Sequence, residues 1–183
     1  MIDILESRFP EVKIIKRKMF PDTRGSFTEL FNSEHYSQFF MNGIAQTNVS
    51  DSKVGVIRGL HWQSEPFSQG KLISCLAGSV FDVVVDLRKS SSTFGKHINF
   101  NLNSITGEAI WIPPGFAHGF QSLESNTKFI YFTSTHYSLE NSLCINPLDS
   151  ELAINWPLPS PTLSNADLNA PKLMDISRCD LFG

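Results

Sequence analysis

The sequence predicts an all-β fold, namely an antiparallel β-sandwich or barrel with a few short helices. The first observation is that runs rich in Val, Ile, Phe and Thr recur at about one per ten residues. The second is that Gly, Pro, Asn and Ser separate these runs. The third is that helix signals are sparse. Short strands at regular spacing, with turns between them, are typical of antiparallel sandwiches and barrels.

The expected strands cover, in chain order, residues 44–50, 54–63, 71–76, 80–87, 98–102, 109–112 and 128–135. The run 80–87 shows the strand period best, because apolar odd positions alternate with a face that carries Asp82 and Asp86. That face either meets water or lines the interior of a barrel. In the second case Asp82 is a buried carboxylate and needs a partner.

Two segments fall outside this pattern. Ser33 is placed to cap a short helix that ends at about Phe40. From Pro157 onward the chain contains four prolines, so we expect an irregular tail wrapped on the domain.

Size and composition limit the class of protein. The chain has 183 residues and a mass of 20.5 kDa, with 41% hydrophobic and 18% charged residues. These values fit a single domain spanning residues 1–183 and exclude a disordered chain. The formal net charge is −3, with 15 Lys and Arg against 18 Asp and Glu. Without a basic surplus we expect no nucleic-acid binding, although a few Arg and Lys suffice for one anionic small ligand.

Cysteine usage and hydropathy bear on location. Cys75, Cys144 and Cys179 are widely spaced and form no Cys-x-x-Cys, which excludes a zinc ribbon or disulfide framework and favours a reducing compartment. The first residues carry acidic side chains and no basic leader, so we expect no signal peptide. No apolar run approaches the roughly 20 residues that span a bilayer. We therefore expect a cytoplasmic protein that does not enter a membrane.

Several catalytic motifs are missing from the sequence: Gly-x-Gly-x-x-Gly, a P-loop, Gly-x-Ser-x-Gly and His-Glu-x-x-His. Small β-barrels that bind iron or manganese often use His-x-His, a nearby Glu and a later His. Here His61 is followed by Gln63 in place of a second His, and His118 could be the later ligand. Two His without a carboxylate at ligand spacing make a poor site for these metals, so we expect no metal and no cofactor.

A metal-free barrel that presents His, Lys, Tyr and acids suits proton transfer. A lone His is more often structural, but two features favour a function for His61. Gly59 lies two residues earlier in the strand, where a missing side chain would leave room for a ligand, and Lys71 begins the next strand. The alternative for Lys71 is that its amine merely extends to solvent.

Longer motifs carry a family resemblance. They are FPDTRGSFTELFN (20–32), QTNVSDSKVGVIRGLHWQ (46–63), QGKLISCLAGSVFDVVVDLRKSSSTFGK (69–96), WIPPGFAHGF (111–120), FIYFTSTHYS (129–138), AINWP (153–157) and LSNAD (163–167). Together they resemble the dTDP-4-dehydrorhamnose 3,5-epimerases, the cupin-type epimerases of deoxysugar biosynthesis. The resemblance runs from about residue 8 to residue 175, and motifs in this order are far more specific than a single short one.

The resemblance implies a cupin or jelly-roll barrel, a homodimer and no metal. The implied substrate is a nucleotide-linked 4-keto-6-deoxyhexose, and the implied enzyme is an isomerase that inverts C3 and C5. A proton next to a ketone becomes removable only when the enolate oxygen is stabilised and a base lies within reach.

By resemblance, His61 matches the general base and Asp167 the acid that orients it. Lys71 matches the cation beside the C4 oxygen, and Tyr131 the acid that returns a proton from the opposite face. His118 matches a substrate-contacting histidine, with Asp82 as its partner.

The residues that match the nucleotide side are Arg24, Glu29, Gln46, Asn48, Arg58 and Tyr137. Arg24 and Arg58 would face the diphosphate, and Tyr137 would stack on the base. In a regular strand Arg58 points away from His61. Both can touch one ligand only if a bulge or a second subunit intervenes, and otherwise Arg58 is a surface arginine.

The sequence departs from the family pattern at the nucleotide side. Where the family usually has Tyr-Tyr-x-Pro, this chain has His136-Tyr137-Ser138-Leu139. Ser142 stands where the family has a Glu, and Ala166 stands where it has a Lys just before the acid that matches Asp167. These departures leave the choice of nucleotide open, with dTDP first.

Three alternatives to the double epimerase stay open. They are an epimerase that inverts one carbon or acts on another nucleotide-4-keto sugar, a metal-dependent cupin oxygenase, and a non-catalytic sugar-nucleotide binder. The intact set of His61, Lys71, Tyr131 and Asp167 speaks against the last.

Overall fold

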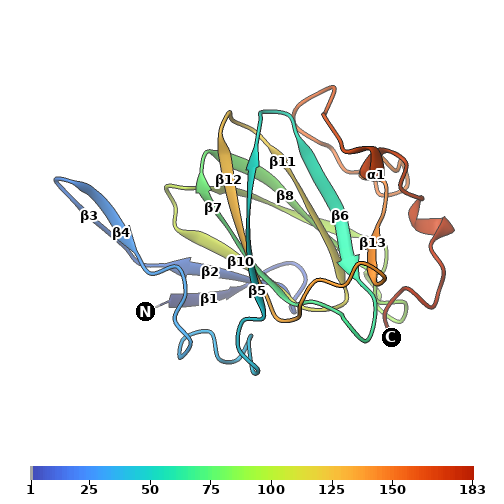
Figure 1. The fold of residues 1–183 in the computed structure, drawn as a ribbon, viewed down its shortest axis with the longest axis horizontal. Coiled ribbons are helices and arrows are strands. Elements are labelled where there is room, and N and C mark those ends of the chain that lie inside the picture. The colour runs from blue at the N-terminus through green and yellow to red at the C-terminus, as the bar shows by residue number, and fades with distance from the viewer. Residues whose placement is uncertain (1) are drawn as a thin grey trace.

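The computed structural model describes residues 2–183, which form two antiparallel sheets packed face to face (Figure 1). The six-stranded sheet contains, from edge to edge, β1 (Ile2–Glu6), β2 (Lys13–Arg17), β10 (Glu108–Ile112), β7 (Lys71–Ala77), β12 (Thr127–Thr133) and β5 (Gln46–Ser52). The five-stranded sheet contains β13 (Ser142–Cys144), β6 (Ile57–Gln63), β11 (Phe116–Ser122), β8 (Ser79–Asp86) and β9 (His97–Asn103). The all-β prediction is confirmed, and the arrangement is that of a jelly-roll sandwich.

A hairpin, β3 (Met19–Asp22) and β4 (Gly25–Thr28), extends away from both sheets (Figure 1). Its aromatic side chains Phe20 and Phe27 are exposed. The sequence prediction did not include this hairpin, because its strands are short and contain Pro21 and Gly25.

The core explains the pattern of the run around Asp82. One apolar cluster fills the space between the sheets and includes Val84 of β8 and Phe129 of β12. A second cluster packs Val83 and Val85 of β8 against the C-terminal part of the chain. Because β8 is covered on both faces, Asp82 is fully buried, and the barrel-interior alternative is the one that the structure shows.

The tail contains only short regular elements. They are α1 (Asn165–Leu168), the 3₁₀ helix η1 (Leu173–Asp175) and two isolated bridges, Val56–Thr162 and Arg88–Phe182. Figure 1 shows α1 beside β6 and β13. The first bridge ties the tail to Val56, directly before β6, which is the strand that carries His61.

The helix expected after Ser33 is wrong. Residues 33–39 form consecutive turns. Asn32, and not Ser33, accepts the backbone N–H of Glu34 (3.0 Å). Tyr36 is fully buried and stacks on Phe31 with ring centroids 5.2 Å apart. Packing these aromatic rings on the sheet outweighs the local helix preference.

Strands β1, β2, β11 and β13 were also not expected. Strand β11 is buried along its whole length yet contains His118, Gly119 and Gln121, so neither alternation nor β-propensity marks it. Its polar side chains are satisfied by tertiary partners that only the fold brings near, such as Asp82 for His118.

Candidate active site

A cavity of about 500 Å³ is lined by residues of both sheets and of the tail. Its lining residues are Asn48, Ser50, Arg58, His61, Trp62, Gln63, Gln69, Lys71, His118, Tyr131, Thr133, Tyr137, Ser142, Ser164, Ala166 and Asp167. Most of the residues expected in a site from the sequence are among them.

His61 and Asp167 form a close pair at this cavity. The Nε2 atom of His61 lies 2.6 Å from Oδ1 of Asp167, although 106 residues separate them. The His61 side chain is 46% exposed, whereas that of Asp167 is 5% exposed. Burial opposes ionisation of the Asp167 carboxyl, but hydrogen bonds to His61 and Ser164 outweigh it and hold its pKa below the ordinary value. A carboxylate bound to Nε2 orients the ring and leaves Nδ1 as the nitrogen that can take a proton.

The N-terminus of α1 sets the position of Asp167. Ser164 is the N-cap, and its Oγ accepts the backbone N–H of Asp167 (3.1 Å). Farther along, Asn146 donates from Nδ2 to the carbonyl of Leu168 (3.1 Å). The acid is therefore held from both sides by side chains of this chain.

A bulge in β6 brings Arg58 to the same cavity as His61. Between the register pairs His118–His61 and Phe120–Arg58, β11 advances by two residues and β6 by three. The extra residue on β6 reverses the side-chain alternation, so both side chains line the cavity. Of the alternatives for Arg58, the bulge is the one that the structure shows.

The expected reason for Gly59 is corrected. A Cβ atom at Gly59 would lie 2.5 Å from Cα of Gly119 and 2.8 Å from the carbonyl oxygen of His118. One at Gly119 would lie 2.7 Å from the carbonyl oxygen of Arg58. Glycine is required here because two backbones approach closely at the bulge, and not because a ligand needs the room.

Lys71 begins β7 on the opposite sheet and reaches across to β6. Its Nζ donates to the carbonyl oxygen of His61 (3.1 Å). Burial lowers the pKa of the Lys71 amine to about 8. Its expected alternative, an amine that extends freely to solvent, does not describe this geometry.

Tyr131 lies on β12 of the same sheet as Lys71. Its hydroxyl is 3.4 Å from Oγ of Ser50 on β5. Burial raises the pKa of the Tyr131 phenol, so the phenol keeps its proton at neutral pH and can donate it.

His118 and Asp82 form a second pair, deeper in the fold. Their Nε2 and Oδ2 atoms are 2.7 Å apart, and the side chains are 4% and 0% exposed. Burial raises the pKa of Asp82 against the opposing effect of His118. His118 lines the cavity, while Asp82 is not one of the lining residues and supports His118 from behind.

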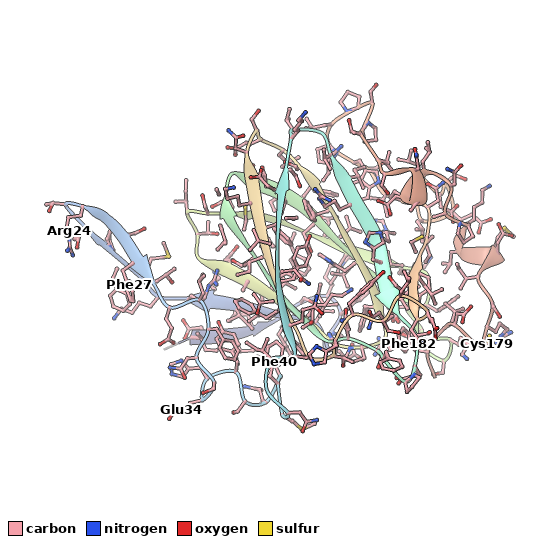
Figure 2. All side chains as sticks on the ribbon, in the orientation of Figure 1. Arg24, Phe27, Glu34, Phe40, Cys179 and Phe182 are labelled. Carbon is pink, nitrogen blue, oxygen red and sulfur yellow. The ribbon has the colours of Figure 1, made fainter. Side chains whose placement is uncertain are left out.

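The residues expected on the nucleotide side divide into two groups. Asn48, Arg58 and Tyr137 line the cavity. Gln46 is not a lining residue, but it donates to Asn48 Oδ1 and accepts the backbone N–H of Tyr137. Arg24 instead lies near the tip of the β3–β4 hairpin, paired with Asp22 and far from the cavity (Figure 2).

Glu29, just after the hairpin, also lies away from the cavity within one chain. Its carboxylate accepts from Asn32 (3.1 Å) and lies 3.0 Å from His35 Nδ1. One chain therefore brings together all the expected catalytic residues and only part of the expected nucleotide side.

Sequence reasoning missed several polar lining residues. Ser50, Gln63, Gln69 and Thr133 each lie two positions from an expected site residue, namely Asn48, His61, Lys71 and Tyr131. Since side chains two apart share a strand face, this spacing was the available signal. Ser164 could have been found as a cap three residues before Asp167.

Among residues 2–183, no group of three or more His, Cys, Asp or Glu side chains is arranged to hold a metal ion. In the same range, no helix is long and apolar enough to cross a membrane. The cavity offers a half-exposed imidazole held by a carboxylate, a partly buried amine and a partly buried phenol. Such a set can remove a proton from a carbon, stabilise the negative charge that develops on an oxygen, and return a proton.

A family model described as dTDP-4-dehydrorhamnose 3,5-epimerase matches residues 6–175. A dTDP-4-dehydrorhamnose 3,5-epimerase of Shigella flexneri is 42% identical over 176 residues, which cover 95% of this chain and 97% of that protein. The chain belongs to the dTDP-4-dehydrorhamnose 3,5-epimerase family. The resemblance seen in the motifs is thereby confirmed, and the protein is an isomerase.

Solved structures of this epimerase family agree with the fold. A dTDP-6-deoxy-D-glucose-3,5-epimerase of Legionella pneumophila, in complex with dTDP-4-keto-L-rhamnose, matches with a TM-score of 0.94 and 40% identity, covering 100% of this chain and 98% of that one. A 3'-monoepimerase of Streptomyces bikiniensis, in complex with dTDP-quinovose, matches with a TM-score of 0.87 and 32% identity, covering 92% and 87%. The family fold thus includes enzymes named for two centres and for one.

Proposed function

We propose that this epimerase inverts C3 and C5 of dTDP-4-dehydro-6-deoxyglucose to give dTDP-4-dehydro-L-rhamnose. The observation that supports the proposal is that the residues assigned here as base and acid line one cavity from different sheets. His61 comes from the five-stranded sheet, and Tyr131 and Lys71 come from the six-stranded sheet. Inversion requires removal of a proton from one face of the ring and return of a proton to the other.

In the proposed reaction, His61 takes the proton from the carbon next to the C4 ketone, and the C–H electron pair forms an enolate. The Lys71 ammonium stabilises the charge that develops on the C4 oxygen. Tyr131 then protonates the same carbon from the opposite face, and exchange with solvent restores both groups. Asp167 keeps the His61 ring in place and stabilises the imidazolium. The same cycle at the other carbon beside the ketone gives the second inversion.

For the nucleotide, the proposal assigns Arg58 to the diphosphate, Asn48 and Gln46 to polar contacts, and Tyr137 to stacking on the base. The Arg58 guanidinium donates to Ser52 Oγ (3.0 Å) and to the Asp51 carbonyl (3.1 Å), which hold it at the cavity. Planar guanidinium donors suit phosphate oxygens. We keep dTDP as the first choice of carrier and another nucleotide as the alternative, because Ser142 and Ala166 line the cavity where the family pattern has Glu and Lys.

We also propose that the active enzyme is a homodimer in which Arg24 and Glu29 complete the cavity of the partner subunit. The projecting hairpin and its exposed Phe20 and Phe27 support this. Within one chain, Arg24 lies far from the cavity (Figure 2), and neither Arg24 nor Glu29 lines it. Mixing the Arg24→Glu and His61→Ala variants tests it. Mixed dimers would contain one intact site and regain activity, whereas sites built within one chain would stay inactive.

A cytoplasmic location is part of the proposal, supported by three free cysteines.

The test of the reaction is proton exchange. The enzyme is incubated in D₂O with dTDP-4-keto-6-deoxyglucose, and the sugar protons are followed by NMR, with His61→Ala as control. Exchange at both C3 and C5 that the control lacks supports the proposal. Exchange at a single carbon would make the protein a mono-epimerase, which the likeness to the 3'-monoepimerase makes the second candidate. Absence of exchange would contradict this substrate.

A further inference from the structure

The segment that carries Tyr137 is held by three glutamine side chains from three parts of the fold. Gln69, just before β7, donates to the carbonyl of Thr135 (2.6 Å). Gln63, at the end of β6, donates to the carbonyl of His136 (3.1 Å) and accepts the N–H of Ser138 (2.8 Å). Gln46, at the start of β5, accepts the N–H of Tyr137 (3.0 Å). Four consecutive residues, 135–138, are therefore bonded through their backbone to these glutamines.

Gln63 is the centre of this arrangement. Gln63 is buried, with only 3% of the residue exposed. Besides its two bonds to the Tyr137 segment, it donates to the carbonyl of Phe67 (2.6 Å), which lies in the loop after β6. One amide thus joins two loops at the cavity wall with both its oxygen and its nitrogen.

Tyr137 itself is 56% exposed at the cavity, so its ring is not held by burial. An exposed ring on a loose segment would have to be ordered each time a ligand binds, and this ordering weakens affinity. A segment bonded in advance avoids that loss. The backbone hydrogen bonds therefore fix the position of the segment that carries the Tyr137 ring.

We propose that Gln63 is a positioning residue for ligand binding, which holds the Tyr137 segment so that the ring is in place to receive the base of the nucleotide sugar. This rests on the stacking role of Tyr137 in the proposed function. Gln63 stands where a metal-binding barrel would carry a second histidine ligand. In this protein its amide holds the segment that carries Tyr137.

The primary test replaces Gln63 by Met, which keeps a similar volume and removes all three hydrogen bonds. We expect KM for dTDP-4-keto-6-deoxyglucose to rise about tenfold while kcat changes less than about threefold. Backbone amide exchange of Tyr137 and Ser138 should accelerate, with the amides of β11 unchanged. Unchanged exchange at these two amides would show that Gln63 does not hold the Tyr137 segment and would overturn the proposal.

Gln121→Met is the matched control. Gln121 is also buried, and it makes two backbone hydrogen bonds, both 2.9 Å, to Leu158 in the tail. The tail between Leu158 and Asp167 is separately bonded to Gly55 and Ile57 through Thr162. We expect a similar loss of thermal stability in Gln121→Met without a rise in KM. Equal changes in KM in the two variants would reduce Gln63 to an ordinary structural residue and overturn the proposal.

A double variant separates this inference from the function on which it rests. If Gln63 acts through Tyr137, then adding Gln63→Met to Tyr137→Ala should raise KM no further. A full additional increase would overturn the proposal. If Tyr137→Ala leaves KM unchanged, the stacking role fails and the effect of Gln63 on binding falls with it. If Tyr137→Ala raises KM but Gln63→Met does not, only the inference about Gln63 is overturned.

Discussion

The two His–Asp pairs of this protein have the same chemistry and opposite surroundings. In the pair His61–Asp167 the imidazole is 46% exposed and its acid comes from the C-terminal tail. In the pair His118–Asp82 both side chains are almost completely buried, and they come from neighbouring strands β11 and β8. Hydrogen bonding keeps the pKa of Asp167 low, whereas burial raises that of Asp82. Both histidines line the cavity, but the imidazole of the first pair is open to solvent, whereas the second pair is buried in the protein.

His61→Ala should break the first pair with the largest effect on activity. Removal of a general base lowers rates by about 10²–10⁴-fold. Because the side chain is half-exposed, the unfolding free energy should change little. The measurement is C3 and C5 proton exchange by NMR beside a urea melt. A rate within a few-fold of the parent would contradict the role of His61.

Asp82→Ala should have the opposite phenotype, with stability as the main loss. Removing Asp82 leaves the buried Nε2 of His118 without its hydrogen-bond partner, and we expect about 3 kcal/mol less unfolding free energy. Chemical denaturation measures this. Asp167→Ala is the matched control and should cost much less stability. Equal losses in the two variants would erase the distinction between the pairs.

Asp167→Asn keeps the shape of the first pair and removes its charge. We expect kcat to fall about 10²-fold, because the imidazolium that forms on His61 loses its counter-charge. The measurement is turnover at saturating substrate, with a thermal melt to show that the fold is retained. An unchanged kcat would make Asp167 dispensable to the base.

The amine of Lys71, which lies beside the first pair, should make kcat fall at alkaline pH. Burial lowers the pKa of Lys71 to about 8, so its ammonium is lost as pH rises through that value. If the ammonium is required, kcat should fall about tenfold per pH unit above pH ~8. The Lys71→Met variant should turn over slowly at every pH and should not show this fall in kcat above pH ~8. A fall that persists in the variant would come from another titrating group.

The Lys71 contribution to the unfolding free energy should rise with pH in the range where kcat falls. The folded-state pKa of Lys71 lies below the ordinary value of 10.5. Between about pH 8 and that value the unfolded chain therefore binds more protons, so the Lys71 contribution to the unfolding free energy rises with pH. Comparing the parent with Lys71→Met by urea melts across this range isolates the contribution.

Ser164→Ala should have the smallest effect, because it touches the first pair only through the cap of α1. Loss of an N-cap costs about 1 kcal/mol. The Ser164 Oγ also holds the N–H of Asp167, so we expect a modest, few-fold loss of kcat. Urea melts and turnover measure both, and a loss as large as that of Asp167→Asn would show that Ser164 does more than cap.

Much of the fold could be predicted from local patterns. The strands expected at 71–76, 80–87 and 98–102 agree with β7, β8 and β9 to within one residue at each end, because alternation and β-propensity are local signals. Strand β11 could not be found in this way, since its His118 and Gln121 are stabilised by partners distant in sequence. The turns at 33–39 show the reverse case, where aromatic packing outweighs a capping signal.

By itself, the sequence determined the all-β class, the family through its ordered motifs, and the identity of the catalytic candidates. Tertiary structure alone decided how these residues meet. A bulge in β6 turns Arg58 to the side of His61, and the tail brings Asp167 to within 2.6 Å of a ring 106 residues away. The hairpin carries Arg24 out of its own cavity. The physical reason is that residue types and periods are local, whereas register shifts and long-range contacts depend on how the whole chain packs.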